Sequence, residues 1–141
     1  MSNIEALTEE ECIKLVAGQE IGRIAFTGRY GPAVLPVNYR LHDGAIWFRT
    51  SVHGPLDDDL RTGIANADYV VAFEVDDIDP AHRAGWSVLI QGAAHRVISA
   101  AERVAAEQAG VMPWPDGEHE LFIRISPHRV TGRRVTRSDA P

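Results

Sequence analysis

Six stretches of the chain alternate apolar and polar residues, which is the pattern of β-strands with one buried face. The alternation predicts strands over residues 22–27, 33–41, 45–51, 69–75, 86–97 and 120–130. His42-Asp43-Gly44 separates the second strand from the third and is typical of a tight hairpin turn. Pro36 cannot donate a hydrogen bond to a neighbouring strand, so it indicates a sheet edge or a bulge. Gly92 indicates a bend or bulge in the fifth strand, and residues 76–85 are expected to form a loop.

Three short helices are predicted beside these strands. Thr8-Glu9-Glu10-Glu11 has the form of a capping box, and it predicts a helix over residues 9–17. Ser99-Ala100-Ala101-Glu102 has the same form and predicts a helix that ends at about Ala109. Apolar residues spaced four apart predict a further helix over residues 56–66.

Strands joined mostly by hairpin-length turns, with short helices at the margins, favour a mainly β fold. Six strands of this spacing predict a closed or nearly closed antiparallel barrel, because closure leaves no exposed strand edge. A single domain is expected over residues 1–141. No window approaches the ~18 consecutive apolar residues of a membrane span, residues 1–11 lack a signal-peptide pattern, and Cys12 has no cysteine partner. A cytoplasmic protein without membrane contact is therefore expected.

The charge of the chain is negative and unevenly spread. Twenty acidic and 14 basic residues give a net charge of −6, which argues against a nucleic-acid partner. From Arg124 to the end, however, the chain carries five arginines and one acid, Asp139. We interpret this run as a solvated edge strand followed by a flexible basic tail over residues 131–141. The alternative is that part of the run contacts a phosphate group or a partner.

The common catalytic sequence motifs are absent. The six histidines show no spacing typical of metal ligands, and there is no second cysteine to assist them. Asp76, Asp77 and Asp79 lack the glycine and the glutamate of a calcium-binding loop. We therefore predict no metal site and nominate no acid–base residue.

One cluster of residues is a candidate site. Residues 36–39 and 47–51 are predicted hairpin partners, so they lie side by side. Together they offer aromatic and apolar surface, an amide, a cation and two hydroxyl groups, a combination that suits a planar heteroaromatic cofactor with a phosphate. A helix starting near Leu56 would direct its N-terminal amides to the same place. The structural alternative is that the aromatic residues are ordinary barrel residues and that Arg49 pairs with an acid.

Five segments of the chain stand in an order and spacing that are familiar from one family: Gly22-Arg23-Ile24-Ala25-Phe26, Leu35-Pro36-Val37-Asn38-Tyr39, Ile46-Trp47-Phe48-Arg49-Thr50, Val71-Ala72-Phe73-Glu74-Val75-Asp76-Asp77 and Gly85-Trp86-Ser87-Val88-Leu89-Ile90-Gln91-Gly92. In this order they resemble small proteins, of actinobacterial type, of the pyridoxamine phosphate oxidase-like superfamily. The resemblance covers residues 7–130. It implies a six-stranded split barrel of the FMN-binding type, and a homodimer that binds two flavin mononucleotides at its interface.

The resemblance also implies positions for the cofactor contacts. In the family, these contacts come from the second strand, from the third strand with the segment after it, and from the fifth strand. The matching positions here are Leu35, Pro36, Val37 and Asn38, then Phe48, Arg49, Thr50 and Ser51, then Gly54, Pro55 and Leu56, and finally Trp86 and Ser87. The family's phosphate-binding Ser-Arg-Lys motif falls on residues 54–56, so both of its cations are missing in this chain.

The resemblance predicts an FMN-dependent oxidoreductase or reductase that acts on a small molecule, with the redox chemistry supplied by the flavin. A true pyridoxamine phosphate oxidase is not expected, because the chain is short and lacks recognisable substrate residues. The two missing cations remove charge-assisted hydrogen bonds worth roughly 1.5–3 kcal/mol each, unless Arg49, Arg61, His53 or an arginine of a partner subunit compensates. Two alternatives therefore stay open: a deazaflavin in the same groove, and a barrel that holds no cofactor and acts as a binding protein.

Overall fold

The computed structural model describes residues 2–28, 30–50, 69–111 and 121–137, which form two helices and one antiparallel sheet of seven strands. In chain order, the elements of this described part are β1 (Ser2–Ala6), α1 (Glu9–Ala17), β2 (Ile21–Gly28), β3 (Gly31–His42), β4 (Ala45–Thr50), β5 (Tyr69–Asp79), β6 (Ala84–Arg96), α3 (Ala100–Ala109) and β7 (Leu121–Arg137). Neither described helix combines the length and the apolar character needed to cross a membrane. The predicted helix over residues 56–66 lies outside the described residues.

The sheet closes into a barrel. Its strands follow the order β1-β7-β4-β3-β2-β5-β6, and an additional pairing of β6 with β7 completes a circuit of six strands. The predicted antiparallel barrel is therefore confirmed, but the strand count is seven rather than six. The additional strand, β1, pairs with the C-terminal end of β7. Alternation did not reveal it, because Ser2–Ala6 contains one large apolar residue, Ile4, whose side chain is 68% exposed.

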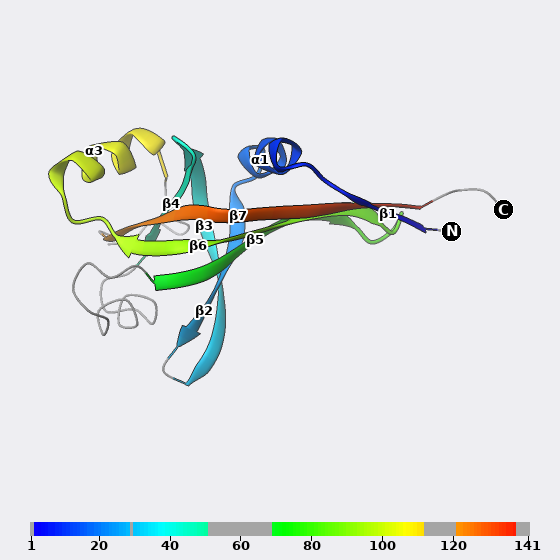
Figure 1. The fold of residues 1–141 in the computed structure, drawn as a ribbon, viewed down its shortest axis with the longest axis horizontal. Coiled ribbons are helices and arrows are strands. Elements are labelled where there is room, and N and C mark those ends of the chain that lie inside the picture. The colour runs from blue at the N-terminus through cyan, green and yellow to red at the C-terminus, as the bar shows by residue number, and fades with distance from the viewer. Residues whose placement is uncertain (1, 29, 51–68, 112–120, 138–141) are drawn as a thin grey trace.

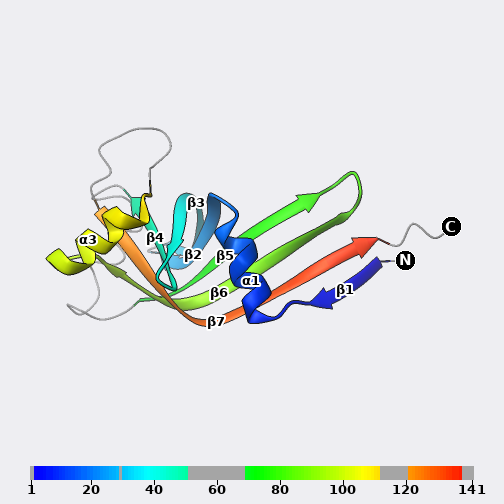
Figure 2. The same cartoon turned by 90° about the horizontal axis from the view of Figure 1, so that it is seen from above.

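The long strands β5, β6 and β7 give the molecule its elongated shape. In Figure 1 they extend past α1, and β1 lies beside the end of β7, where both chain termini are found. Figure 2 shows α1 lying across these strands, with α3 at the opposite end of the molecule near β4. The β3–β4 hairpin and the end of β6 that carries Trp86 are thus different regions of one sheet.

Two groups of buried side chains stabilise this arrangement. The main core fills the barrel, and α1 contributes Cys12 and Val16 to it. A second cluster lies between α3 and the other face of β4 and β7, and it consists of Ala45, Trp47, Ala106, Val111 and Phe122. Successive residues of a strand point to opposite faces. The unbroken apolar runs at Ala45–Phe48 and Leu121–Ile123 are therefore buried on both faces.

Both described helices begin where the sequence predicts. At α1 the capping box is complete, because Thr8 and Glu11 each accept a hydrogen bond from the other's backbone N–H. At α3 only half of the predicted box forms: Ser99 accepts a bond from the Glu102 N–H. The Glu102 carboxylate lies instead 2.6 Å from Nε2 of His95 on β6, so it fastens the helix to the sheet.

The predicted turn and bulge are also confirmed. Asp43 and Gly44 have φ values of 51° and 72°, as a tight hairpin between β3 and β4 requires. The register between β6 and β7 shifts between Gln91 and Gly92. A Cβ atom at Gly92 would lie only 2.1 Å from the backbone oxygen of Ser126, so glycine is needed where the two strands approach.

Two expectations about strand ends are wrong. The predicted loop over residues 76–85 is mostly sheet, because β5 and β6 remain paired as far as Asp79 and Ala84. The predicted flexible tail is also absent over residues 131–137, which belong to β7 and pair with β6 and β1. In both places charged side chains on the solvated face interrupt the apolar–polar alternation by which a strand is predicted. Backbone pairing does not require apolar residues on that face.

Candidate functional site

The candidate site is built on the β3–β4 hairpin. β4 pairs with β3 only over Tyr39–His42, whereas β2 pairs with the other side of β3 over Gly31–Asn38. Within the described part of the chain, no strand therefore covers the β4 side of residues 31–38. This confirms the sheet edge predicted from Pro36 for the described strands. Such an edge presents backbone N–H and C=O groups that can bond a ligand.

The predicted contacts on β3 fall on two faces of this edge. Leu35 and Val37 are half-buried and pack against the main core. Pro36 is exposed and Asn38 is half-buried, and both belong to the alternate, outward positions. A ligand at this edge can therefore meet backbone groups along the segment together with the side chains of Pro36 and Asn38.

The aromatic surface predicted for this hairpin does not exist. Tyr39 and Phe48 are 0% exposed and Trp47 is 2% exposed. The Tyr39 hydroxyl donates to the backbone oxygen of Val16, and the Trp47 indole N–H donates to the backbone oxygen of His42 at 2.9 Å. Burial holds the pKa of Tyr39 above its ordinary value. The ring of Phe48 is part of the main core, so a cofactor contact at Phe48 stays a prediction that only its backbone could fulfil.

Arg49 and Thr50 end β4 and pair with β7. The guanidinium carbon of Arg49 lies 5.2 Å from the centroid of the Phe122 ring, which is a cation–π distance. Arg103 from α3 lies over the same ring at 5.9 Å. No local pattern indicated that a helix would bring a second guanidinium here; the apolar run around Phe122 indicated only that both faces are covered. Ser51, Gly54, Pro55 and Leu56 lie outside the described residues.

The last two predicted contacts, Trp86 and Ser87, lie on another part of the sheet. Trp86 packs against the main core, and Ser87 pairs with Asp76 of β5. The strands β2 and β5 separate β6 from β3. Three strand spacings of about 4.8 Å place Ser87 about 14 Å from Asn38 across the sheet. One copy of the chain does not bring the two parts of the predicted site together.

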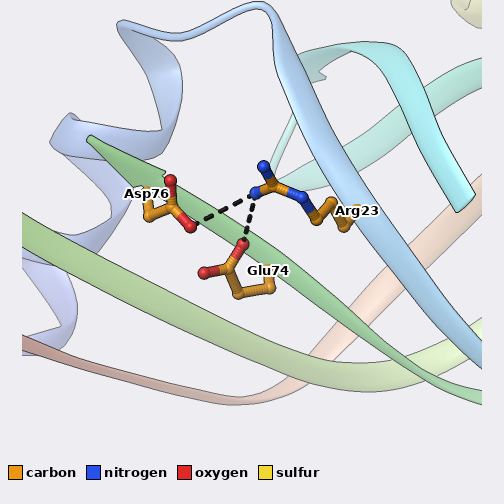
Figure 3. A network of polar contacts seen from close by, with 3 residues as sticks. All are labelled: Arg23, Glu74 and Asp76. Atoms are coloured by element: carbon orange, nitrogen blue, oxygen red, sulfur yellow. Dashed lines mark hydrogen bonds and ion pairs between the residues drawn. The ribbon is translucent and has the colours of Figure 1, made fainter. Parts of the chain in front are cut away.

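A charged network that the sequence analysis missed lies between these two parts (Figure 3). The Nη1 atom of Arg23 is 3.2 Å from Oε1 of Glu74 and 3.2 Å from Oδ2 of Asp76. Burial, followed by the hydrogen bond with Asp76, raises the pKa of Glu74 to about 7, although Arg23 opposes this shift. The network borders a hollow of about 340 Å³ on the sheet surface. The only sequence signal is that two acids share one face of an apolar strand.

Comparisons with known proteins agree with one another. A family model described as Pyridoxamine 5'-phosphate oxidase matches residues 8–134. The uncharacterized protein Rv0080 of Mycobacterium tuberculosis is 38% identical over 129 residues, covering 92% of this chain and 84% of that protein. A crystal structure from Corynebacterium glutamicum with the same family description has a TM-score of 0.80 and 26% identity, with 99% of both chains covered. The FAD binding protein of Mycobacterium smegmatis has a TM-score of 0.72 and 31% identity, with 92% of this chain and 98% of that chain covered.

Proposed function

Because the chain belongs to the pyridoxamine 5'-phosphate oxidase family, we propose that it is a flavin-dependent oxidoreductase acting on a small molecule, with FMN as its flavin. The likeness to an FAD binding protein at 31% identity supports a flavin as the cofactor class. A bound flavin would supply the redox chemistry. The residues of the chain would bind it, orient it and exclude water from it.

The observation that carries this proposal is the edge of β3 beside the end of β4. On the side of β3 away from β2, the backbone groups of residues 35–38 face no strand of the described part. They offer donors and acceptors in a row, which fits the polar edge of a flavin ring. Arg49 and Thr50 follow at the end of the neighbouring strand, on opposite faces of it, and the guanidinium of Arg49 fits a phosphate. The donor set therefore suits a flavin, with Arg49 in place of the missing family cations.

A homodimer is part of the proposal. Trp86 and Ser87 match flavin-contacting positions of the family but lie about 14 Å from Asn38 across the sheet of one copy. A second copy can supply them to the same cofactor. We therefore propose one flavin at each of two equivalent sites between the subunits.

The visible spectrum of the purified protein, followed by titration with FMN and with FAD, tests the cofactor. We expect uptake of one flavin per subunit, with the tighter binding for FMN. A colourless protein that takes up neither flavin at micromolar concentration would contradict the proposal. A bound chromophore absorbing at shorter wavelength than flavin would favour a deazaflavin. No uptake of any of these cofactors would favour a binding protein, as the residues at 54–56 suggest.

Replacement of Arg49 tests the site itself. We expect Arg49→Ala to weaken FMN binding by about 10- to 150-fold, which is the loss of one charge-assisted hydrogen bond of roughly 1.5–3 kcal/mol. Arg103→Ala is the matched control, because it removes the other guanidinium from the Phe122 ring. An equal loss in both variants would show that Arg49 acts only through packing on that ring. Unchanged FMN affinity in folded Arg49→Ala protein would remove Arg49 from the site.

A further inference from the structure

Two arginines lie on aromatic rings where β4 and β7 pair beneath α3. Arg49 of β4 stands directly opposite Phe122 of β7, and its guanidinium carbon lies 5.2 Å from the centroid of that ring. Two residues earlier on β4 the order is reversed: Trp47 stands opposite Arg124, whose guanidinium carbon lies 5.5 Å from the Trp47 ring. Side chains directly opposite each other in an antiparallel pair are close enough to interact. Each strand therefore supplies an aromatic ring to an arginine of the other.

The two arginines differ in their place in the sheet. Nη1 of Arg124 is 2.5 Å from Oγ of Ser126 on the same strand, and the paired strands β4 and β6 lie on either side of it. Arg49, in contrast, follows Phe48, which is the last residue of β4 that pairs with β3. Arg49 therefore stands where the open edge of β3 begins, within the candidate site, whereas Arg124 belongs to the closed part of the barrel.

The ring of Phe122 is held in place from several directions. Its side chain is 7% exposed and packs with the fully buried Ala106 of α3 in the second cluster. The backbone oxygen of Phe122 accepts a hydrogen bond from the Val97 N–H at 2.9 Å. The helix that covers the ring is itself fastened to β6, because Glu102 lies 2.6 Å from His95. A ring packed in this way cannot follow a moving guanidinium, so it offers Arg49 one fixed surface.

A fixed surface matters because an arginine side chain has much conformational freedom to lose. Ordering a long, flexible side chain costs free energy when it first engages a ligand, and a side chain that is ordered beforehand avoids this cost. The attraction between a guanidinium and the face of a ring uses the positive charge but none of the N–H donors. The donors of Arg49 can therefore serve a phosphate while the ring holds the group in position.

We propose that Phe122 is a positioning residue that holds Arg49 toward the flavin phosphate and thereby makes the site select a phosphorylated flavin over riboflavin. The proposal rests on the proposed function for the flavin and for the role of Arg49, and it adds the positioning residue and the selectivity. Arg103 lies on the same ring, but its Nε atom is 3.7 Å from Oε1 of Glu107 on α3. The charge of Arg103 is thus balanced within the helix, and Arg49 is the cation that Phe122 presents to the ligand.

The first test compares FMN with riboflavin, which has the same ring system without the phosphate, by fluorescence titration. We expect the wild type to prefer FMN, and we expect Phe122→Leu to lower this preference by about 3- to 30-fold with riboflavin affinity unchanged. Phe122→Tyr keeps an aromatic ring and should keep the wild-type preference. The control is Val111→Ala, which removes buried volume from the same cluster but leaves the ring, and should also keep it. Equal losses for both flavins in Phe122→Leu, or an unchanged preference, would overturn the proposal.

The second test needs neither flavin nor a folded Phe122→Leu protein. In the NMR spectrum of the wild type at mildly acidic pH, the Nε–Hε signal of Arg49 is identified by its loss in Arg49→Ala. A proton over the face of an aromatic ring is shifted upfield by the ring current, so we expect this signal upfield of its ordinary position. We also expect it to move on addition of inorganic phosphate. A signal at the ordinary position, or one that phosphate does not move, would contradict the proposed role of Phe122.

The outcomes separate this inference from the proposed function. A protein that takes up no flavin, but whose upfield Arg49 signal responds to phosphate, would retain the positioning of Arg49 by Phe122 and reject the flavoenzyme. A protein that prefers FMN equally with and without the Phe122 ring would retain the flavoenzyme and reject the positioning role. A wild type that binds FMN and riboflavin with equal affinity would retain a flavin and reject Arg49 as its phosphate contact.

Discussion

Among single residues, Glu74 leads to a prediction about pH. Its pKa in the folded protein is about 7 rather than 4.5, because burial and the hydrogen bond with Asp76 outweigh the attraction of Arg23. Between these two values the folded chain keeps a proton that the unfolded chain has released. The free energy of unfolding therefore falls as pH rises through this range, and the contribution of Glu74 is lost above about pH 7. We expect Glu74→Gln to reduce this dependence, because the amide does not titrate.

Urea unfolding between about pH 5 and about pH 8 measures this effect at constant protein concentration. Glu107→Gln is the matched control, because that carboxylate is exposed on α3 and pairs with Arg103 at 3.7 Å. The control should keep the wild-type slope of unfolding free energy against pH. Equal slopes for wild type and Glu74→Gln would contradict the assignment of the proton to Glu74.

Residues that act on near neighbours along the chain could be predicted, and residues that act across the sheet could not. Thr8 and Glu11 cap the same helix, so four consecutive letters were enough to predict α1. Asp43 and Gly44 identified their turn for the same reason. The contact of Arg49 with Phe122 depends on the register between β4 and β7, which no local pattern encodes. The aromatic residues of the hairpin fitted a cofactor surface and a barrel core equally well, and only packing decided between the two.

At the level of elements, the docking of α1 on β7 depends on Gly132. A Cβ atom at this position would lie 2.6 Å from Sγ of Cys12 and 3.0 Å from the backbone oxygen of Ser87. We expect Gly132→Ala to lower the free energy of unfolding by about 1–3 kcal/mol, because the helix must shift away from the strand. Adding Cys12→Ala should recover part of this loss, since it removes the nearest atom. Denaturant unfolding of the wild type, the two single variants and the double variant measures the coupling energy between the two positions. Strictly additive losses would show that a side chain at position 132 does not contact the helix through Cys12.

The end of β7 gives a second prediction for the elements. A chain that stops after Val130 loses the strand that pairs with β1 and with much of β6. We expect this chain to be largely unfolded by circular dichroism, whereas a chain that stops after Arg137 should fold like the wild type. A folded chain ending at Val130 would restore the interpretation of residues 131–141 as a tail. That interpretation failed because the residue that faces α1 at this point is a glycine, Gly132. A large apolar residue there would have indicated that the strand continues.

For the whole molecule, the strand pattern predicted an antiparallel barrel but not how it closes. Hairpin pairings such as β3 with β4 follow from short turns, and the residues of these turns can be recognised in the sequence. The closing pair, β6 with β7, is joined through α3 and residues outside the described part, so chain order alone did not specify it. Alternation identifies the core face of a strand, and it does not account for exposed apolar residues at outward positions such as Val34 and Leu89.

The last prediction couples assembly to cofactor binding. If the flavin touches both copies, a subunit that cannot dimerise lacks part of the site even though Arg49 and Thr50 are unchanged. We expect FMN to bind at least about 10-fold more weakly at protein concentrations at which the subunits are separate than at concentrations at which they form the dimer, and we expect saturating FMN to lower the dissociation constant of the wild-type dimer. These two effects are reciprocal by thermodynamic linkage. The free energy by which dimerisation strengthens FMN binding equals the free energy by which bound FMN strengthens dimerisation. Fluorescence titration with FMN over a dilution series of the protein measures the first, and sedimentation velocity with and without FMN measures the second. Equal FMN affinity in monomer and dimer would show that each subunit holds its flavin alone, and the partner's Ser87 would then have no place in the site.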